Sequence, residues 1–137
     1  MSDDLDRFVT AQERDYETVL GELRRGRKSS HWIWFIFPQI AGLGHSSMSQ
    51  HFAIGSLDEA RAYLAHPVLG PRLRECARLV LAVEGRTAEE ILGSTDAMKL
   101  RSSMTLFHRA APDELQFGLV LDRYYDGAED EATLARL

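Results

Sequence analysis

HWIWFIF, residues 31–37, is apolar on every side and is followed by Pro38. A run of this kind is buried whether it forms a strand or a helix. Its aromatic and β-branched residues favour a strand, but the chain contains no other convincing strand, and a lone strand leaves its backbone groups without hydrogen-bond partners. We therefore predict a short buried helix at the centre of the core, with Ser29 or Ser30 as its N-cap and Pro38 ending it.

Helices are predicted on both sides of this run. An apolar stripe at helical spacing runs from Asp4 to Arg25, and Gly26 follows it. Ser56 and Thr87 each open a capping-box pattern. The predicted helices are 4–25, 31–37, a short one reaching residue 54, 56–65, 66–84, 87–92, 96–110 capped by Ser94 or Thr95, 112–125, and a terminal turn capped by Asp130. We expect an all-α fold, an irregular orthogonal bundle of seven or eight short helices in a single domain over residues 1–137.

The composition is that of one globular domain. The 137 residues are 45% hydrophobic and 27% charged, with ten glycines and four prolines, which excludes disordered, collagen-like and disulfide-scaffold chains. A domain of this size needs neither a metal nor a disulfide to fold. The N-terminal sequence has no basic start followed by an apolar run, and nowhere are there roughly 18 consecutive apolar residues. We therefore expect a cytoplasmic protein with no membrane span.

The net charge limits the kind of partner. It is −5 at pH 7, so the field of the whole molecule repels nucleic acid and anionic membrane surfaces. The cations of residues 24–28 are too few to reverse this, and nucleic acid is not the expected partner. An anionic partner must therefore be bound by a local group of residues.

The sequence predicts no metal site and no cofactor. Its single cysteine, Cys76, lies in an apolar-periodic stretch and is expected to be a small core residue. None of the five histidines forms an i,i+4 pair on a helix, which disfavours a structural zinc site. Imidazole titrates near neutrality, so His31 and His45 are candidates for proton transfer, against the alternative that they are hydrogen-bonded structural residues.

Two glycine-bearing turns flank the aromatic run and have the composition of anion-binding turns. Gly26-Arg27-Lys28-Ser29-Ser30-His31 places cations and hydroxyls at the start of a predicted helix, where free amides and the helix dipole favour phosphate or carboxylate. Gly42-Leu43-Gly44-His45-Ser46-Ser47 combines glycines that allow close backbone approach with serines that can donate hydrogen bonds. The alternative is a helix end followed by an ordinary N-cap. The glycine spacing of Walker and Rossmann motifs is absent.

The stretch 96–107 places three hydroxyls inside a predicted helix, where Ser and Thr are neutral to unfavourable. Lys99 shares a helix face with Ser102 and Ser103. Either these three residues line a polar pocket, or the hydroxyls let helices approach closely and bond back to the preceding turn. A Ser-Lys catalytic dyad has no further support.

Four blocks carry a family resemblance. They are GRK (26–28) with HWIWFIFPQ (31–39), GLG (42–44), AxxYLxHPxLGxRL (60–73) and KLxSSMTLF (99–107). Together they resemble a bacterial domain-of-unknown-function family, numbered 1810, over nearly the whole chain. The resemblance implies a compact, mainly α-helical single domain and brings no established reaction. The polar residues that recur in the family fall at Lys28, His31, Gln39, Lys99, Ser102 and Ser103.

We expect a polar cleft that binds a small anionic ligand, phosphate-bearing or nucleotide-like. Arg27 and Lys28 supply charge and Trp32 a wall. The other candidate ligand-binding residues are Ser29, Ser30, Gln39, Gly42, Gly44, Ser46, Lys99, Ser102 and Ser103. The alternative is a protein-interaction or regulatory module without a small-molecule site, to which the acidic segment 126–131 could contribute.

Overall fold

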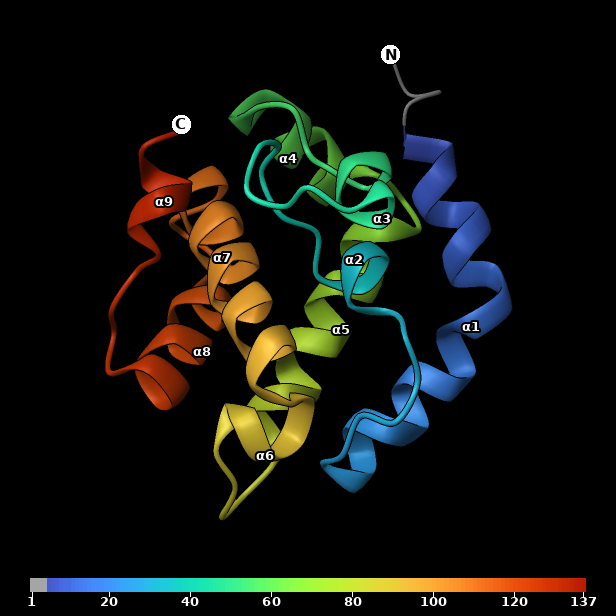
Figure 1. Ribbon diagram of the computed structural model, residues 1–137, viewed down its shortest axis with the longest axis vertical. Coiled ribbons are helices and arrows are strands. Elements are labelled where there is room, and N and C mark those ends of the chain that lie inside the picture. Colours follow the sequence, from blue (N-terminus) through green and yellow to red (C-terminus); the bar gives the residue numbers. More distant parts are fainter. Residues whose placement is uncertain (1–4) are drawn as a thin grey trace.

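The computed structural model describes residues 5–137, and these form an all-α fold (Figure 1). The helices are α1 (Asp6–Arg25), α2 (Ile33–Ile36), α3 (Ser47–His51), α4 (Leu57–Ala65), α5 (Leu69–Ala82), α6 (Ala88–Leu92), α7 (Ser94–Ala110), α8 (Leu115–Tyr125) and α9 (Glu131–Leu134). The predicted fold class is confirmed. The described residues contain nine helices where seven or eight were expected, because the turn after Asp130 closes into a helix of its own.

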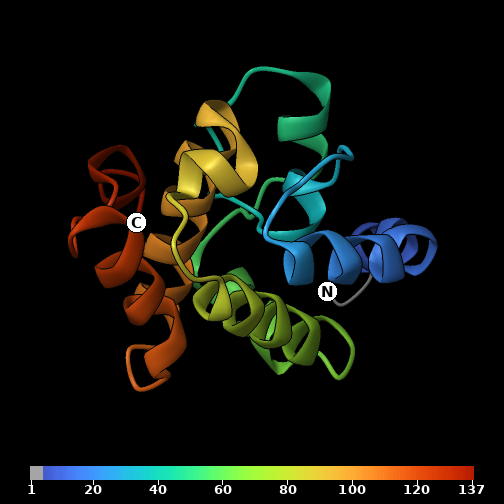
Figure 2. The same ribbon diagram turned by 90° about the horizontal axis from the view of Figure 1, so that it is seen from below.

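The aromatic run lies at the centre of the bundle. α2 packs against α1, α5 and α7, and the view from below shows it between α1 and the α6–α7 pair (Figure 2). Trp32, Ile33, Phe35, Ile36 and Phe37 are all buried, and Trp34 is partly buried. The predicted short buried helix is therefore confirmed, and it joins the long helices into one core.

The predicted N-cap of this helix is wrong. α2 begins at Ile33 after Trp32, and no side chain caps it. Ser29 and Ser30 lie upstream of the helix and form hydrogen bonds with Glu22 on α1 instead. A four-residue helix packed in the core gains its stability from burial, so a missing cap costs it little.

Several other helix starts follow their predicted caps. Ser56 accepts from the Glu59 amide, Thr87 and Glu90 form a complete capping box, and Asp130 accepts from the Thr133 amide. The predicted caps of α7 are wrong, because Ser94 and Thr95 lie inside its first turn and Gly93 precedes it without a side-chain cap.

Two further boundaries differ from prediction. α5 begins at Leu69, since His66 Nδ1 accepts hydrogen bonds from the amides of Val68 and Leu69 and holds the preceding residues in a turn. The predicted 112–125 helix begins at Leu115, after Glu114 in extended conformation.

The segment between α2 and α4 forms a loop that contains α3, and its two ends lie side by side. α3 ends at His51, short of the predicted residue 54, and its N-cap is Ser46. Ile40 and Ile54 form an isolated parallel bridge, in which the Ala41 amide donates to Ile54 and the Ile54 amide donates to Gln39. The second glycine-bearing turn is therefore held at its base by backbone hydrogen bonds.

None of the helices within residues 5–137 combines the length and the apolar character needed to cross a membrane.

Candidate functional site

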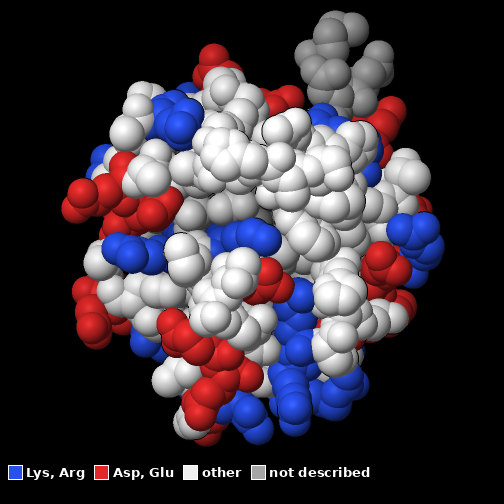
Figure 3. Space-filling model, in the orientation of Figure 1, with Lys and Arg blue, Asp and Glu red and all other residues white. Residues whose placement is uncertain are grey.

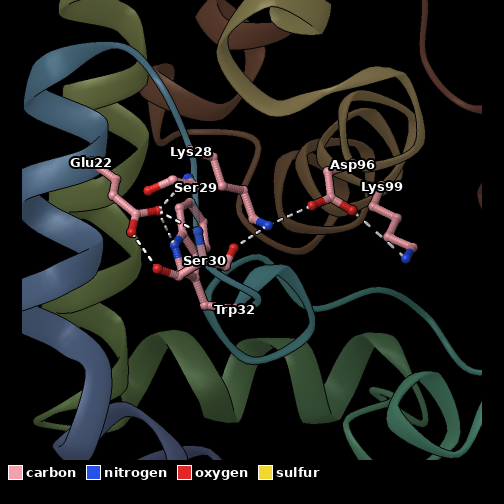
Figure 4. Close-up of polar contacts among 7 residues, drawn as sticks. All are labelled: Glu22, Lys28, Ser29, Ser30, Trp32, Asp96 and Lys99. Carbon is pink, nitrogen blue, oxygen red and sulfur yellow. Dashed lines mark hydrogen bonds and ion pairs between the residues drawn. The ribbon is translucent and has the colours of Figure 1, made fainter.

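The carboxylate of Glu22 occupies the first glycine-bearing turn (Figure 4). Its Oε1 accepts hydrogen bonds from the Ser29 amide at 2.7 Å, the Ser30 amide at 3.0 Å and the Trp32 indole at 2.9 Å, and its Oε2 accepts from the Ser30 hydroxyl. The glutamate is 2% exposed. The turn does bind an anion as its composition indicates, but that anion belongs to the chain itself.

These hydrogen bonds change the pKa of Glu22. Burial opposes ionisation, but the bonds from the Ser30 hydroxyl, the Ser29 amide and the Trp32 indole outweigh it and lower the pKa from 4.5 to about 2. The charged form of the glutamate is therefore the one that holds the turn.

Glu22 is expected to make the stability of the protein fall between about pH 4.5 and about pH 2. Because the pKa is lower in the folded state, the stabilisation is complete above the unfolded value of 4.5 and is lost as the pH falls through about 2. The contribution amounts to about 3 kcal/mol. Urea unfolding over this pH range should show a steeper loss for the wild type than for Glu22→Gln. Identical pH profiles for the two proteins would contradict the assignment.

Two lysines share one carboxylate next to this turn. Lys28 Nζ lies 2.8 Å from Asp96 Oδ2 and also donates to the Ser30 carbonyl, while Lys99 Nζ lies 3.8 Å from Asp96 Oδ1. Figure 4 shows Asp96 between the two ammonium groups. Each lysine also lies 5.1 Å from the ring centre of a tryptophan, Lys28 over Trp32 and Lys99 over Trp34. The group carries two positive charges against one negative charge.

A cavity of about 310 Å³ opens at the start of α7. We name it the α7-start pocket; it is lined by Lys28, Ser29, Ser30, His31, Leu92, Gly93, Ser94, Thr95 and Asp96. The first-turn amides of α7, at residues 94–96, have no acceptor within residues 5–137, since no side chain caps this 17-residue helix. Free amides and the positive end of the helix dipole therefore meet the lysine pair.

A second cavity of about 250 Å³ lies on the other side of the first turn of α7. We name it the α7–α9 pocket; it is lined by Gln39, Leu43, Gly44, Thr95, Met98, Lys99, Ser102, Asp130 and Ala132. Figure 3 shows this face hollowed between the surface over α7 and that over the loop before α3, with basic atoms at the lower border. Thr95 lines both pockets, so the two adjoin at the first turn of α7.

The comparisons with known proteins identify the family. The model described as "Protein of unknown function (DUF1810)" matches residues 2–137. The chain belongs to the DUF1810 family. A crystal structure of "the conserved hypothetical protein Rv1873 from Mycobacterium tuberculosis" is 54% identical, with the match covering 98% of this chain and 96% of that one at a TM-score of 0.96. A search of curated proteins found no match. The resemblance seen in the sequence is therefore confirmed.

The DUF1810 fold brings eight of the predicted site residues to the two pockets. Lys28, Ser29, Ser30 and His31 line the α7-start pocket, and Gln39, Gly44, Lys99 and Ser102 line the α7–α9 pocket. The two glycine-bearing turns line different pockets, and Thr95 of α7 lines both.

The other predicted residues lie outside the pockets. Arg27 and His45 are exposed, Trp32 is buried beneath Lys28, Gly42 packs against Arg136, Ser46 caps α3 and Ser103 is fully buried with an unpartnered hydroxyl. Of the two histidine candidates, only His31 lines a pocket.

Ser94, Asp96 and Asp130 line the pockets but were not among the predicted site residues. Gly93-Ser94-Thr95-Asp96 is a run of four residue types that favour helix starts, and it was predicted only to cap α7. Ser102 fits both interpretations of the α7 hydroxyls. It lines a pocket, and its hydroxyl also donates to the Met98 carbonyl of the preceding turn at 3.2 Å.

Two other sequence features of this DUF1810 protein are structural. Cys76 is fully buried, and burial raises the pKa of its thiol to about 12, which excludes it as a nucleophile at neutral pH. In the acidic segment 126–131, Glu129 forms two hydrogen bonds with Arg109 and Asp130 caps α9. Both Glu129 oxygens are therefore engaged, whereas Asp130 uses only its Oδ2 within residues 5–137.

Proposed function

We propose that this DUF1810 protein binds a small anionic ligand, with its phosphate or carboxylate group in the α7-start pocket. One observation carries the proposal: the uncapped first turn of α7 opens beside two lysines that share a single carboxylate. Helix N-terminal amides bind anions well, and a local excess of positive charge adds to the attraction.

The surroundings of the pocket add to its positive potential. Arg24, Arg25, Arg27 and Arg86 are exposed, none forms an ion pair within residues 5–137, and the Arg86 side chain lies beside Gly26. Lys and Arg atoms gather at the lower margin of the face in Figure 3, beside a group of Asp and Glu atoms. Although the whole molecule is negative, this end attracts anions and guides them toward Lys28.

The proposed roles follow from the contacts. Ser94 and Thr95 offer their backbone amides, Lys28 and Lys99 supply charge, and the exposed His31 is the group placed to exchange a proton with a bound anion. Ser29 and Ser30 shape the wall of the pocket, since Glu22 accepts hydrogen bonds from both of their amides and from the Ser30 hydroxyl.

Replacing Ser94 with aspartate is expected to weaken anion binding at least about tenfold without harming the fold. The new carboxylate fills the anion's position, repels a second negative charge and, at a helix N-terminus, stabilises α7 by about 0.3–1 kcal/mol. Isothermal titration with a panel of nucleotides, sugar phosphates and inorganic phosphate measures the effect. We expect at least one panel member to bind the wild type and to bind Ser94→Asp at least about tenfold more weakly.

Ser94→Asn is the matched control, because it has nearly the same shape and no charge. It should keep the affinity of the wild type, and Ser94→Asp should melt at an equal or higher temperature. A silent panel, or equal affinity for the aspartate and asparagine variants, would remove the proposal.

A further inference from the structure

We infer that the ligand is an organic phosphate whose uncharged body extends past Thr95 into the α7–α9 pocket, and that a nucleoside monophosphate is of the right class. This inference rests on the proposed function, since it takes the phosphate to lie in the α7-start pocket. It assigns the second cavity to the same ligand.

The two pockets adjoin at the first turn of α7. The exposed Thr95 lines both, and Lys99 lines the second pocket while its ammonium reaches toward Asp96 in the first. A group attached to a phosphate at the start of α7 therefore enters the α7–α9 pocket after passing a single side chain.

The α7–α9 pocket has walls that suit an uncharged ring. Leu43, Met98 and Ala132 provide apolar contact, and Met98 is 71% exposed, so a large apolar side chain faces water at the pocket unless a ligand covers it. A cavity of about 250 Å³ holds a ring-bearing group and is larger than a phosphate needs.

Besides Lys99, the polar side chains of this pocket include acceptors for hydrogen-bond donors. Asp130 Oδ2 accepts bonds from Ser102 and Thr133, whereas Asp130 Oδ1 has no partner within residues 5–137. The side-chain amide of Gln39 likewise has no hydrogen-bond partner among the described residues, and it can donate and accept. Hydroxyl and amino groups of a nucleoside match this set.

The test compares AMP, adenosine and inorganic phosphate on the full chain by isothermal titration. We expect AMP to bind at least about tenfold more tightly than inorganic phosphate. Ala132→Trp fills the α7–α9 pocket from an exposed position and should remove that gain while leaving phosphate affinity unchanged. Ala135→Trp is the matched control, since Ala135 is exposed and lies outside the pocket lining, and it should bind both as the wild type does.

The outcomes separate this inference from the proposed function. If phosphate binds and is lost in Ser94→Asp, but AMP binds no more tightly or Ala132→Trp leaves the gain intact, the inference is overturned and the proposed function stands. If adenosine binds as tightly as AMP, the inference also fails, because the nucleoside then binds without any contribution from the phosphate. If none of the three probes binds the wild type, the inference is overturned, and the wider panel of nucleotides and sugar phosphates decides the proposed function.

Discussion

Glu22→Ala is expected to lower the free energy of unfolding by about 3–5 kcal/mol. The substitution removes the acceptor of the Ser29 and Ser30 amides, the Ser30 hydroxyl and the Trp32 indole, and the carboxylate that accepts all four is almost completely buried. Buried donors without partners are costly, and these four hold the turn that leads from α1 to α2. Urea denaturation of the purified variant measures the loss.

Glu22→Gln is the control for this prediction. Its amide oxygen can accept the three bonds made to Oε1, and the Ser30 hydroxyl can turn to accept from the amide nitrogen. We expect a loss of about 3 kcal/mol, the contribution of the charge, which is at the lower end of the range for the alanine variant. If both variants were as stable as the wild type, the turn would not depend on Glu22.

Gly70→Ala is expected to cost about 3 kcal/mol or more and to lower the melting temperature by roughly 10 °C. A Cβ at Gly70 would lie 2.1 Å from the carbonyl oxygen of Leu64 and 2.9 Å from its carbonyl carbon. Both are backbone atoms at the end of α4, so α4 and α5 must separate to admit one methyl group. Thermal unfolding followed by circular dichroism measures the shift.

The same substitution at Gly21 should change the stability in the opposite direction. Gly21 lies inside α1, and the nearest atom to its added Cβ is the flexible end of Arg25 at 3.4 Å. Alanine is favoured over glycine within a helix, so Gly21→Ala should raise stability by up to about 1 kcal/mol. A loss at Gly70 no larger than the change at Gly21 would show that the close approach of α4 and α5 is unimportant.

The fold was predictable where local chemistry decides it. The apolar run 31–37 had to be buried, and the absence of a pairing strand made it a helix. Ser56, Thr87 and Asp130 cap their helices because the bonds involved lie within one turn. The caps predicted at Ser29 and Ser30 are wrong because the amides of both residues and the Ser30 hydroxyl donate to Glu22, which lies on another helix.

The sequence contained one signal of that failure. Glu22 falls among Val19, Leu20 and Leu23 on the buried stripe of α1, and a buried carboxylate requires donors nearby. The candidate site was predictable in its residue types, including Lys28 and Lys99, but not in its arrangement. Asp96 lies one helical turn before Lys99, a local pair, but far along the chain from Lys28, and no local pattern predicts that second contact.

The internal anions of Glu22 and Asp96 have a consequence for the kinetics and thermodynamics of the proposed anion binding. They immobilise the 27–31 turn and the Lys28 side chain during folding, before any ligand arrives. The conformational entropy of these groups is therefore lost once, as part of the native state, and not again in each binding event. A preorganised pocket of this kind favours rapid, rigid-body association over induced fit.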